Sequence, residues 1–353
     1  PNRPVLNLAN STNERLVDLQ QHRNDWFVRH ARRILQERAA AGTNMDSSAA
    51  SLRSIFDTAS DETKRLRAFW ALHVIGGLDE ATLLNDLDDD SEHVRTWAIQ
   101  LLVENRRVGS EKSPLVTDDL SQSAALSPRA VQRLIELAAA DPSPLVRLFL
   151  ASALQRLSHQ SRWAIAEALA AHAEDNSDAN IPLMVWYGVE PLILDDPSEF
   201  ASLAATAKLS KVRQHAARRI ASLEPAEVGL ARLTAVLAES DDDAVSGDLL
   251  AGILAGLAGR RRVDMPDVWG SAYAKLLSSG DAKVKQRAIR LALIFNDQAA
   301  IDRLTTAAED RSTKLADRIV AIDSLVASKV DGFDIVLLRL IDDEAVLRNV
   351  LQG

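Results

Sequence analysis

The sequence predicts an all-α protein built from paired helices that stack in series. Three features predict it: the composition, an amphipathic helix face that recurs along the chain, and a polar capping residue before most copies of that face. Of the 353 residues, 47 % are hydrophobic but only 4 % are aromatic, and glycine occurs 14 times. Alanine, leucine and arginine dominate, which favours helices over β-rich folds.

The recurring face is clearest in residues 91–102, "SEHVRTWAIQLL". Val94, Trp97, Ala98, Leu101 and Leu102 lie at i, i+3, i+4, i+7 and i+8, which is one side of a helix. Successive copies begin 28 to 39 residues apart, with one gap of 52. Spacings of roughly 33–47 residues are typical of paired-helix solenoids. The copies begin at Phe27, Leu66, Val94, Val146, Ile181, Val212, Val245, Val284, Leu315 and Val346.

A capping residue precedes most of these copies by three positions. Nine of the ten residues there can accept a hydrogen bond from the free amides of a new helix; only Leu209 cannot, and Ser210 follows it. The ten residues are Asn24, Thr63, Ser91, Ser143, Asp178, Leu209, Asp242, Asp281, Ser312 and Asp343. This regularity predicts that a second helix of each repeat begins at each of these places.

A first helix of each repeat is expected before the cap, as in residues 79–87, 127–140 and 267–277. Each repeat is then a helix, a tight turn and a second helix. We expect repeats over 1–104, a polar insertion or inter-repeat loop over 105–126, and further repeats over 127–353. Stacked pairs bury a continuous core, so the whole is expected to form one α-solenoid, or superhelix, of about ten repeats.

The most apolar stretch, "LLAGILAGLAG" over 249–259, has 11 residues and is too short to span a bilayer. It predicts a buried helix whose small residues allow close contact with another helix. The last repeat stops shortly after its second helix begins, which leads us to expect that the natural protein continues beyond Gly353.

The charge and the lack of cysteine restrict the possible functions. The formal net charge is −9 and the pI is near 5.4, which argues against a general nucleic-acid binder. The absence of cysteine excludes thiolate zinc sites, disulfides and covalent haem attachment within this chain.

Several residues that look reactive fit the scaffold instead. Trp70, His73 and Trp97 fall on the predicted buried face. The alternating aspartates of "DLDDDSEH" resemble the start of a calcium loop, but Ser91 stands where the turn glycine is needed and Trp97 where the last carboxylate is needed. We therefore expect no catalytic residue, metal or cofactor in this segment.

A basic residue directly follows the first position of five copies: Arg67, Arg95, Arg147, Arg213 and Lys285. Two interpretations remain open. In the first, these cations form a structural ladder with acidic residues in the turns of neighbouring repeats, including Asp61, Asp88 and Asp90. In the second, they form a stripe that receives an acidic partner.

The period and turns such as "DSEHVR" and "DPSPLVR" resemble HEAT-like, or armadillo-like, helical repeats. Residues 16–40 and 65–102 more narrowly resemble the repeat region of large exported planctomycete-type putative membrane-bound dehydrogenases. In those proteins the repeats lie between a β-propeller and a cytochrome c-like domain. The resemblance is strongest over residues 14–103 and implies a periplasmic or exported location, with the redox chemistry outside this segment.

The sequence thus predicts a non-catalytic scaffold or protein-interaction module. The resemblance implies that it is a segment of a larger exported, haem-containing dehydrogenase. Its partners would be a protein or the flanking domains of the same chain, and nucleic acid is not expected. One alternative is a DNA-binding enzyme that resembles helical-repeat alkylpurine DNA glycosylases. Another is a freestanding, cytoplasmic protein-binding adaptor.

Overall fold

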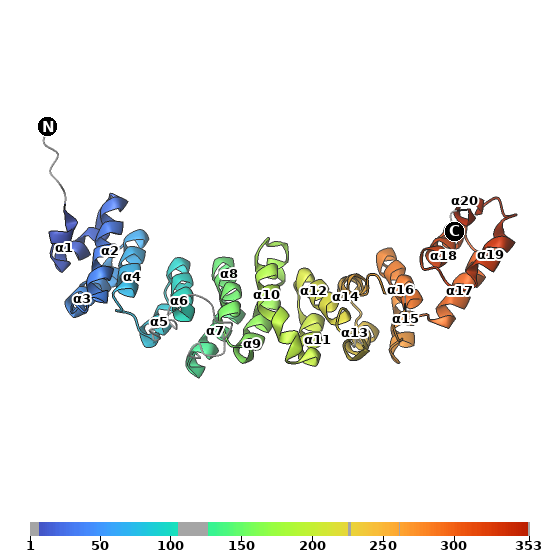
Figure 1. Cartoon of the computed structure of the whole chain (residues 1–353), viewed down its shortest axis with the longest axis horizontal. Helices are drawn as coiled ribbons and strands as arrows, with labels where there is room; N and C mark the ends of the chain where they lie inside the picture. The colour runs from blue at the N-terminus through green and yellow to red at the C-terminus, as the bar shows by residue number, and fades with distance from the viewer. Residues whose placement is uncertain (1–6, 105–125, 225–226, 261, 352–353) are drawn as a thin grey trace, which may run out of the picture. The chain divides into compact units, whose positions relative to one another are not determined.

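The computed structural model describes residues 7–104, 126–224, 227–260 and 262–351, and the regular secondary structure in these ranges is entirely helical (Figure 1). The predicted all-α fold is confirmed. Chain contacts divide the protein into two compact units, Pro1–Ile165 and Ala166–Gly353. The sequence instead predicted that the repeats are interrupted at 105–126. Nearly all of that predicted insertion lies outside the described residues.

Unit 1 contains α1(Asn13–Asp18), α2(Asp25–Ala40), α3(Asp46–Thr58), α4(Glu62–Val74), α5(Glu80–Asp86), α6(Glu92–Glu104), α7(Pro128–Ala140) and α8(Pro144–Ala153). The boundary falls within α9(His159–Ala170). Unit 2 continues with α10(Ile181–Val189), α11(Pro197–Thr206), α12(Ser210–Ala221), α13(Glu227–Glu239), α14(Asp243–Gly256), α15(Trp269–Ser278), α16(Ala282–Ile294), α17(Gln298–Glu309), α18(Leu315–Ala327), α19(Phe333–Leu340) and α20(Leu347–Val350). Short 3-10 helices join some of them: η1(Leu8–Asn10), η2(Leu19–Gln21), η5(Leu154–Arg156), η6(Ala173–Ser177) and η7(Glu190–Leu194).

Within each unit the helices pair and stack in two layers. In unit 1, α3, α5 and α7 each pack against the even-numbered helix that follows, and α2, α4, α6 and α8 pack in series. In unit 2, α11, α13, α15 and α17 do the same, and α10, α12, α14, α16 and α18 pack in series (Figure 1). Both units therefore have the α-solenoid-like packing of a helical-repeat protein. In each unit, we call the even-numbered helices that pack in series the even-numbered layer.

Five of the ten predicted cap positions are confirmed. The side chain of each of these residues accepts a hydrogen bond from a backbone amide at the start of the following helix, at distances from 2.7 to 3.3 Å: Asn24, Ser91, Ser143, Asp242 and Asp281. Asp178 also accepts from the amide of Ile181 at 2.8 Å, but the N-cap of α10 is Asn180. At α12, neither Leu209 nor Ser210 has this role. The amide of Ser210 instead donates to Asn176 Oδ1 at 2.8 Å.

The predicted cap of α4 was wrong by two residues. Asp61, and not Thr63, is the N-cap, and its carboxylate accepts hydrogen bonds from the amides of Thr63 and Lys64 at 2.8 and 3.3 Å. The buried side of α4 consequently shifts to Ala68, Phe69, Ala71 and Leu72. Leu66, Trp70, His73 and Val74 are only half-buried. The predicted buried side of α4 was wrong because these four residues form a second stripe with the same helical spacing.

The caps near the C-terminal end were also misplaced. Lys314 precedes α18, while the Ser312 hydroxyl donates to the Asp310 carboxylate at 2.7 and 2.8 Å. Leu315, expected in the core, is 48 % exposed. Val346 is the N-cap of α20, while Asp343 accepts from the amide of Ala345 at 3.2 Å within the preceding turn.

The corrected cap of α4 gives a direct stability prediction. Asp61→Ala removes the acceptor for two helix amides and is expected to destabilise the protein by about 1 kcal/mol. Thr63→Ala removes an exposed side chain that does not cap the helix and should change stability by less than about 0.5 kcal/mol. Urea denaturation of both variants measures the difference, and an equal loss in the two would contradict the assignment of Asp61.

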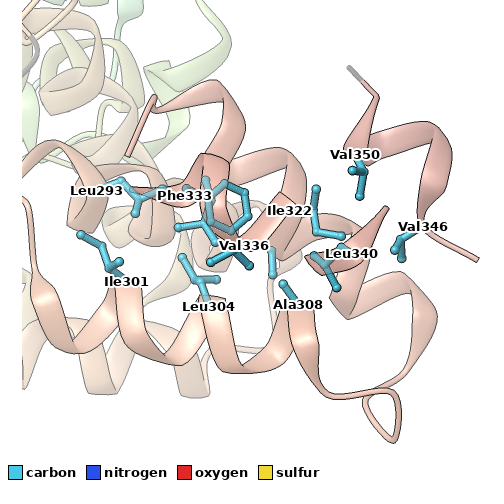
Figure 2. Packing of buried hydrophobic residues seen from close by; sticks show 12 residues of the cluster. Leu293, Ile301, Leu304, Ala308, Ile322, Phe333, Val336, Leu340, Val346 and Val350 are labelled. Atoms are coloured by element: carbon cyan, nitrogen blue, oxygen red, sulfur yellow. The ribbon is translucent and has the colours of Figure 1, made fainter. Parts of the chain in front are cut away.

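Apolar side chains from consecutive helices form the core at the C-terminal end of unit 2 (Figure 2). Leu293 of α16, Ile301 of α17 and Ile322 of α18 lie in one cluster with residues of α19 and α20. Val346, the first apolar position of the last predicted copy, is fully buried in this cluster. The copy thus contributes to the core even though α20 contains only four residues.

Glycines let α12 and α14 approach closely, as the stretch 249–259 predicted. A Cβ atom on Gly252 would lie 2.3 Å from the carbonyl oxygen of Gln214 and 2.7 Å from the Cβ of Ala217. A Cβ on Gly256 would lie 2.4 Å from the carbonyl oxygen of Arg218. Both contacts are shorter than van der Waals packing permits, so the backbones can approach this closely only where glycine is present.

Candidate interaction surfaces on the even-numbered layer

Positions in the even-numbered layer are counted from the N-cap residue, so that Arg95 is at position four after Ser91. Nη1 of Arg95 donates to the carbonyl oxygens of Asp89 and Asp90 at 2.9 and 3.2 Å. Its Nε and Nη2 donate to the two carboxylate oxygens of Asp141 at 2.8 and 3.0 Å. The side chains are 12 % and 3 % exposed. One guanidinium therefore joins the turn of its own repeat to the turn of the next.

The same arrangement recurs at position four of other helices. Arg213 donates to the carbonyl oxygen of Ala207 at 2.8 Å and binds the carboxylate of Asp248. Arg147 donates to the carbonyl oxygen of Asp141 at 2.9 Å. A bidentate guanidinium suits this place, because it can serve a helix-end carbonyl and a carboxylate at once.

Two position-four arginines were missed by the sequence analysis. Arg65 donates to the carbonyl oxygen of Phe56 at 3.0 Å and pairs with Asp89. Arg318 donates to the carbonyl oxygen of Ala308 at 3.0 and 3.1 Å and to Asp343 at 2.8 Å. Both arginines lie four residues after the true N-cap of their helix. This spacing could have identified them, but the caps of α4 and α18 were predicted at the wrong residues.

Arg67 and Lys285 differ from the other predicted ladder residues. Arg67 is at position six, where it donates back to the carbonyl oxygen of His22 at 3.1 Å and to Asp25 at 3.3 Å. Lys285 is at position four of α16 and half-buried, but it forms no hydrogen bond or ion pair with the described residues. An ammonium on a flexible stem lacks the planar fork with which arginine binds both acceptors.

The acidic partners suggested by the sequence were wrong. Asp61 caps α4, Asp88 pairs with Arg133, and Asp90 offers its carbonyl oxygen rather than its carboxylate to Arg95. The carboxylates that pair with the ladder arginines include turn aspartates two residues before a cap. Such an aspartate faces the preceding even-numbered helix and therefore reaches the arginine of that helix. Asp89 and Asp141 are two such residues.

The aspartate run at 86–90 is divided among several structural contacts. Asp86 is buried and accepts hydrogen bonds from Arg53 at 2.9 and 3.1 Å. Burial raises the pKa of Asp86, while the hydrogen bonds and charge of Arg53 act in the opposite direction. Among the described residues, no group of three histidine or acidic side chains is placed to hold a metal ion.

Position six connects neighbouring even-numbered helices. Trp97 of α6 meets Trp70 of α4 edge-on, with ring centroids 5.1 Å apart. His215 of α12 stacks on Trp186 of α10 at 5.3 Å. Arg287 of α16 donates from Nη1 to the carbonyl oxygen of Gly247 in α14 at 2.8 Å.

In unit 1, Trp70 and Trp97 form an aromatic surface with Arg32. Trp70 and Trp97 are half-buried, so the prediction that they belong to the core was wrong: they pack against each other between α4 and α6. The guanidinium carbon of Arg32 lies 5.4 Å from the centre of the Trp70 ring, within cation–π range. Arg32 Nη1 and Trp70 Nε1 are buried N–H donors without an acceptor among the described residues.

His73 is close in sequence to this surface but does not form part of a charged site. It is half-buried rather than in the core. Burial lowers the pKa of His73 below its ordinary value, with a smaller opposing effect from Glu104. The imidazole is therefore neutral at pH 7.

A second surface, in unit 2, is basic. It consists of the residues at positions two, six and nine of α12 and α16: Lys211, His215, Arg218, Lys283, Arg287 and Arg290. Lys211, Arg218, Lys283 and Arg290 are exposed, and their side chains form no hydrogen bond or ion pair with the described residues. We call these six residues the basic surface. The predicted stripe did not include these residues, because it was defined by the residue after the first apolar position and not by the exposed side of the helix.

No protein-family model and no curated protein sequence matches this chain. None of the helices described here is both long and apolar enough to cross a membrane. Fold and surfaces together define the class as a helical-repeat protein with an aromatic surface on the even-numbered helices of unit 1 and a basic surface on those of unit 2.

Proposed function

We propose that this chain is a non-catalytic scaffold of HEAT-like repeats that binds a protein partner or the flanking domains of its own chain. The observation that carries the proposal is the basic surface, where four exposed cations have no bonded acid in the described structure. Exposed unpaired charges on a rigid helical layer favour recognition of a partner of opposite charge.

The roles of the other polar residues support the same function. The arginines at position four and the turn aspartates join neighbouring repeats and are nearly buried by doing so. These residues stabilise the scaffold and leave the exposed positions of the even-numbered layer for binding. Repeat proteins bind partners through such extended layers by many distributed contacts.

We further propose that the chain is a segment of a larger exported, haem-containing dehydrogenase. This part rests on the resemblance of residues 14–103 to the repeat region of the planctomycete-type proteins. The scaffold would hold the catalytic and haem domains at a fixed separation, and its location would be periplasmic or exported.

Affinity purification from the cells that naturally produce the protein tests the proposed function. We expect a tagged chain to retain a protein, or its own flanking domains, at near-stoichiometric amounts in about 0.15 M salt, where exposed charges remain only partly screened. Retention of DNA without a protein partner would contradict the scaffold and favour the DNA-binding enzyme. A titration with duplex DNA at low ionic strength checks that alternative independently.

A further inference from the structure

The distribution of charge singles out α12 and α16 as possible binding elements. Each carries four lysine or arginine residues and no acidic residue, although the whole chain has a net charge of −9. The helix between them, α14, packs against both. A strongly positive region therefore lies on a protein that is otherwise acidic.

Some of these cations are used within the protein and do not contribute to binding. Arg213 binds Asp248, and Arg219 binds Glu190 with Nε 2.8 Å from the carboxylate. Among the described residues, Arg287 donates to a carbonyl oxygen and pairs with no carboxylate, so its charge remains available. Lys211 lies near Asp178, whose pKa is lowered chiefly by the Ile181 and Asn180 amides and slightly by Lys211.

Between the two basic helices, α14 carries short side chains at the corresponding positions. Its residues at positions two, six and nine are Ala244, Asp248 and Ala251, and Asp248 is turned to Arg213, Ser210 and Gln214 of α12. The long side chains of α12 and α16 thus flank a helix with short ones. An extended chain can cross α14 and reach cations on both sides.

We propose that the basic surface is a docking site for an acidic peptide segment, rich in aspartate or glutamate, that lies across α14 and contacts α12 and α16. Neighbouring helices lie roughly 8–10 Å apart, so the two basic helices are about 16–20 Å apart. An extended peptide advances about 3.4 Å per residue, so its two acidic groups should be about five or six residues apart.

A peptide fits this surface better than a nucleic acid does. Asp281 caps α16 two residues before Lys283, and Asp242 and Asp243 lie at the start of α14. These carboxylates would repel a continuous phosphate backbone, whereas a peptide can place its acids away from them. Positions two, six and nine of α12, α14 and α16 also include no Phe, Tyr or Trp on which a base could stack, and the ring of His215 is already stacked on Trp186.

Fluorescence anisotropy of the complete chain tests the proposal. The probe is a labelled octapeptide with two glutamates at each end and four glycine or serine residues between them. The unchanged chain should bind it, and added salt should weaken the binding because exposed charges are screened. The same peptide with glutamine in place of glutamate should not bind.

Two matched variants locate the binding. Arg218→Glu/Arg290→Glu reverses the cations at position nine and should weaken binding about tenfold or more, since two attractions become repulsions. Arg232→Glu/Arg303→Glu makes the same charge change at exposed residues of α13 and α17 and should keep the affinity within about twofold. Lys211→Gln/Lys283→Gln, a milder change at position two, should weaken binding without reversing charge. Circular dichroism and thermal unfolding verify that each variant is folded.

Equal weakening by the α12/α16 and α13/α17 variants would overturn the docking site, because binding would then follow net charge alone. Tighter binding of a single-stranded oligonucleotide of equal charge would overturn the choice of a peptide. The inference rests on the proposed function. A partner that is still captured by the Arg218→Glu/Arg290→Glu variant would disprove this site while leaving the scaffold intact.

Discussion

Arg95→Met is expected to destabilise unit 1 by about 3–5 kcal/mol, because it leaves the carboxylate of Asp141 buried without its cation. Asp141 is 3 % exposed at its side chain and receives both Nε and Nη2 of Arg95. The two turn carbonyls that accept from Nη1 also lose their donor. Thermal and urea denaturation measure the loss.

The double variant Arg95→Met/Asp141→Asn shows whether the buried charge is the cause. It removes the carboxylate together with its partner and should recover part of the stability. Arg129→Met, at an exposed arginine of α7, is the matched control and should cost less than about 0.5 kcal/mol. If Arg95→Met and Arg129→Met unfold alike, the ladder does not stabilise the repeats.

Gly252→Ala is expected to destabilise unit 2 by about 1–3 kcal/mol, since the new methyl group overlaps backbone atoms of α12. The carbonyl oxygen of Gln214 would be only 2.3 Å away, and a backbone atom cannot rotate aside as a side chain can. Alanine has the higher helix propensity, so a loss of stability would report the close approach itself.

Gly270→Ala is the matched control within α15. A Cβ at this position would meet no heavy atom within 4 Å. The substitution should therefore stabilise the protein by about 0.5–1 kcal/mol, the usual gain from replacing glycine in a helix. Opposite signs for the two variants would support the packing of α12 against α14, and a gain at both positions would refute it.

The helical pairs were predictable because their signals are local. Caps such as Ser143 and Asp242 and apolar residues at helical spacing depend on a few neighbouring residues, so they can be read along the chain. The errors arose where two interpretations fit the local pattern. In α4, the stripe containing Trp70 has the same spacing as the core stripe containing Leu72, and only the packing of α4 against its neighbours decides between them.

The partners of the arginine ladder could not be predicted from the sequence. Arg95 and Asp141 are 46 residues apart, and their contact depends on how one repeat stacks on the next. The basic surface could have been found by listing the exposed positions after each true cap. The predicted stripe instead combined mainly residues at the structural position four, so it grouped Arg213 with Lys285 despite their different surroundings.

Cross-linking mass spectrometry of the purified complex tests the central claim most directly, because lysines occur both on and off the basic surface. With a carbodiimide that joins amines to carboxylates, Lys211 and Lys283 should link to acidic residues of the partner. Lys275 of α15 and the exposed Lys329 should not. Links confined to Lys275 or Lys329 would contradict the account, since the partner would then lie away from α12 and α16.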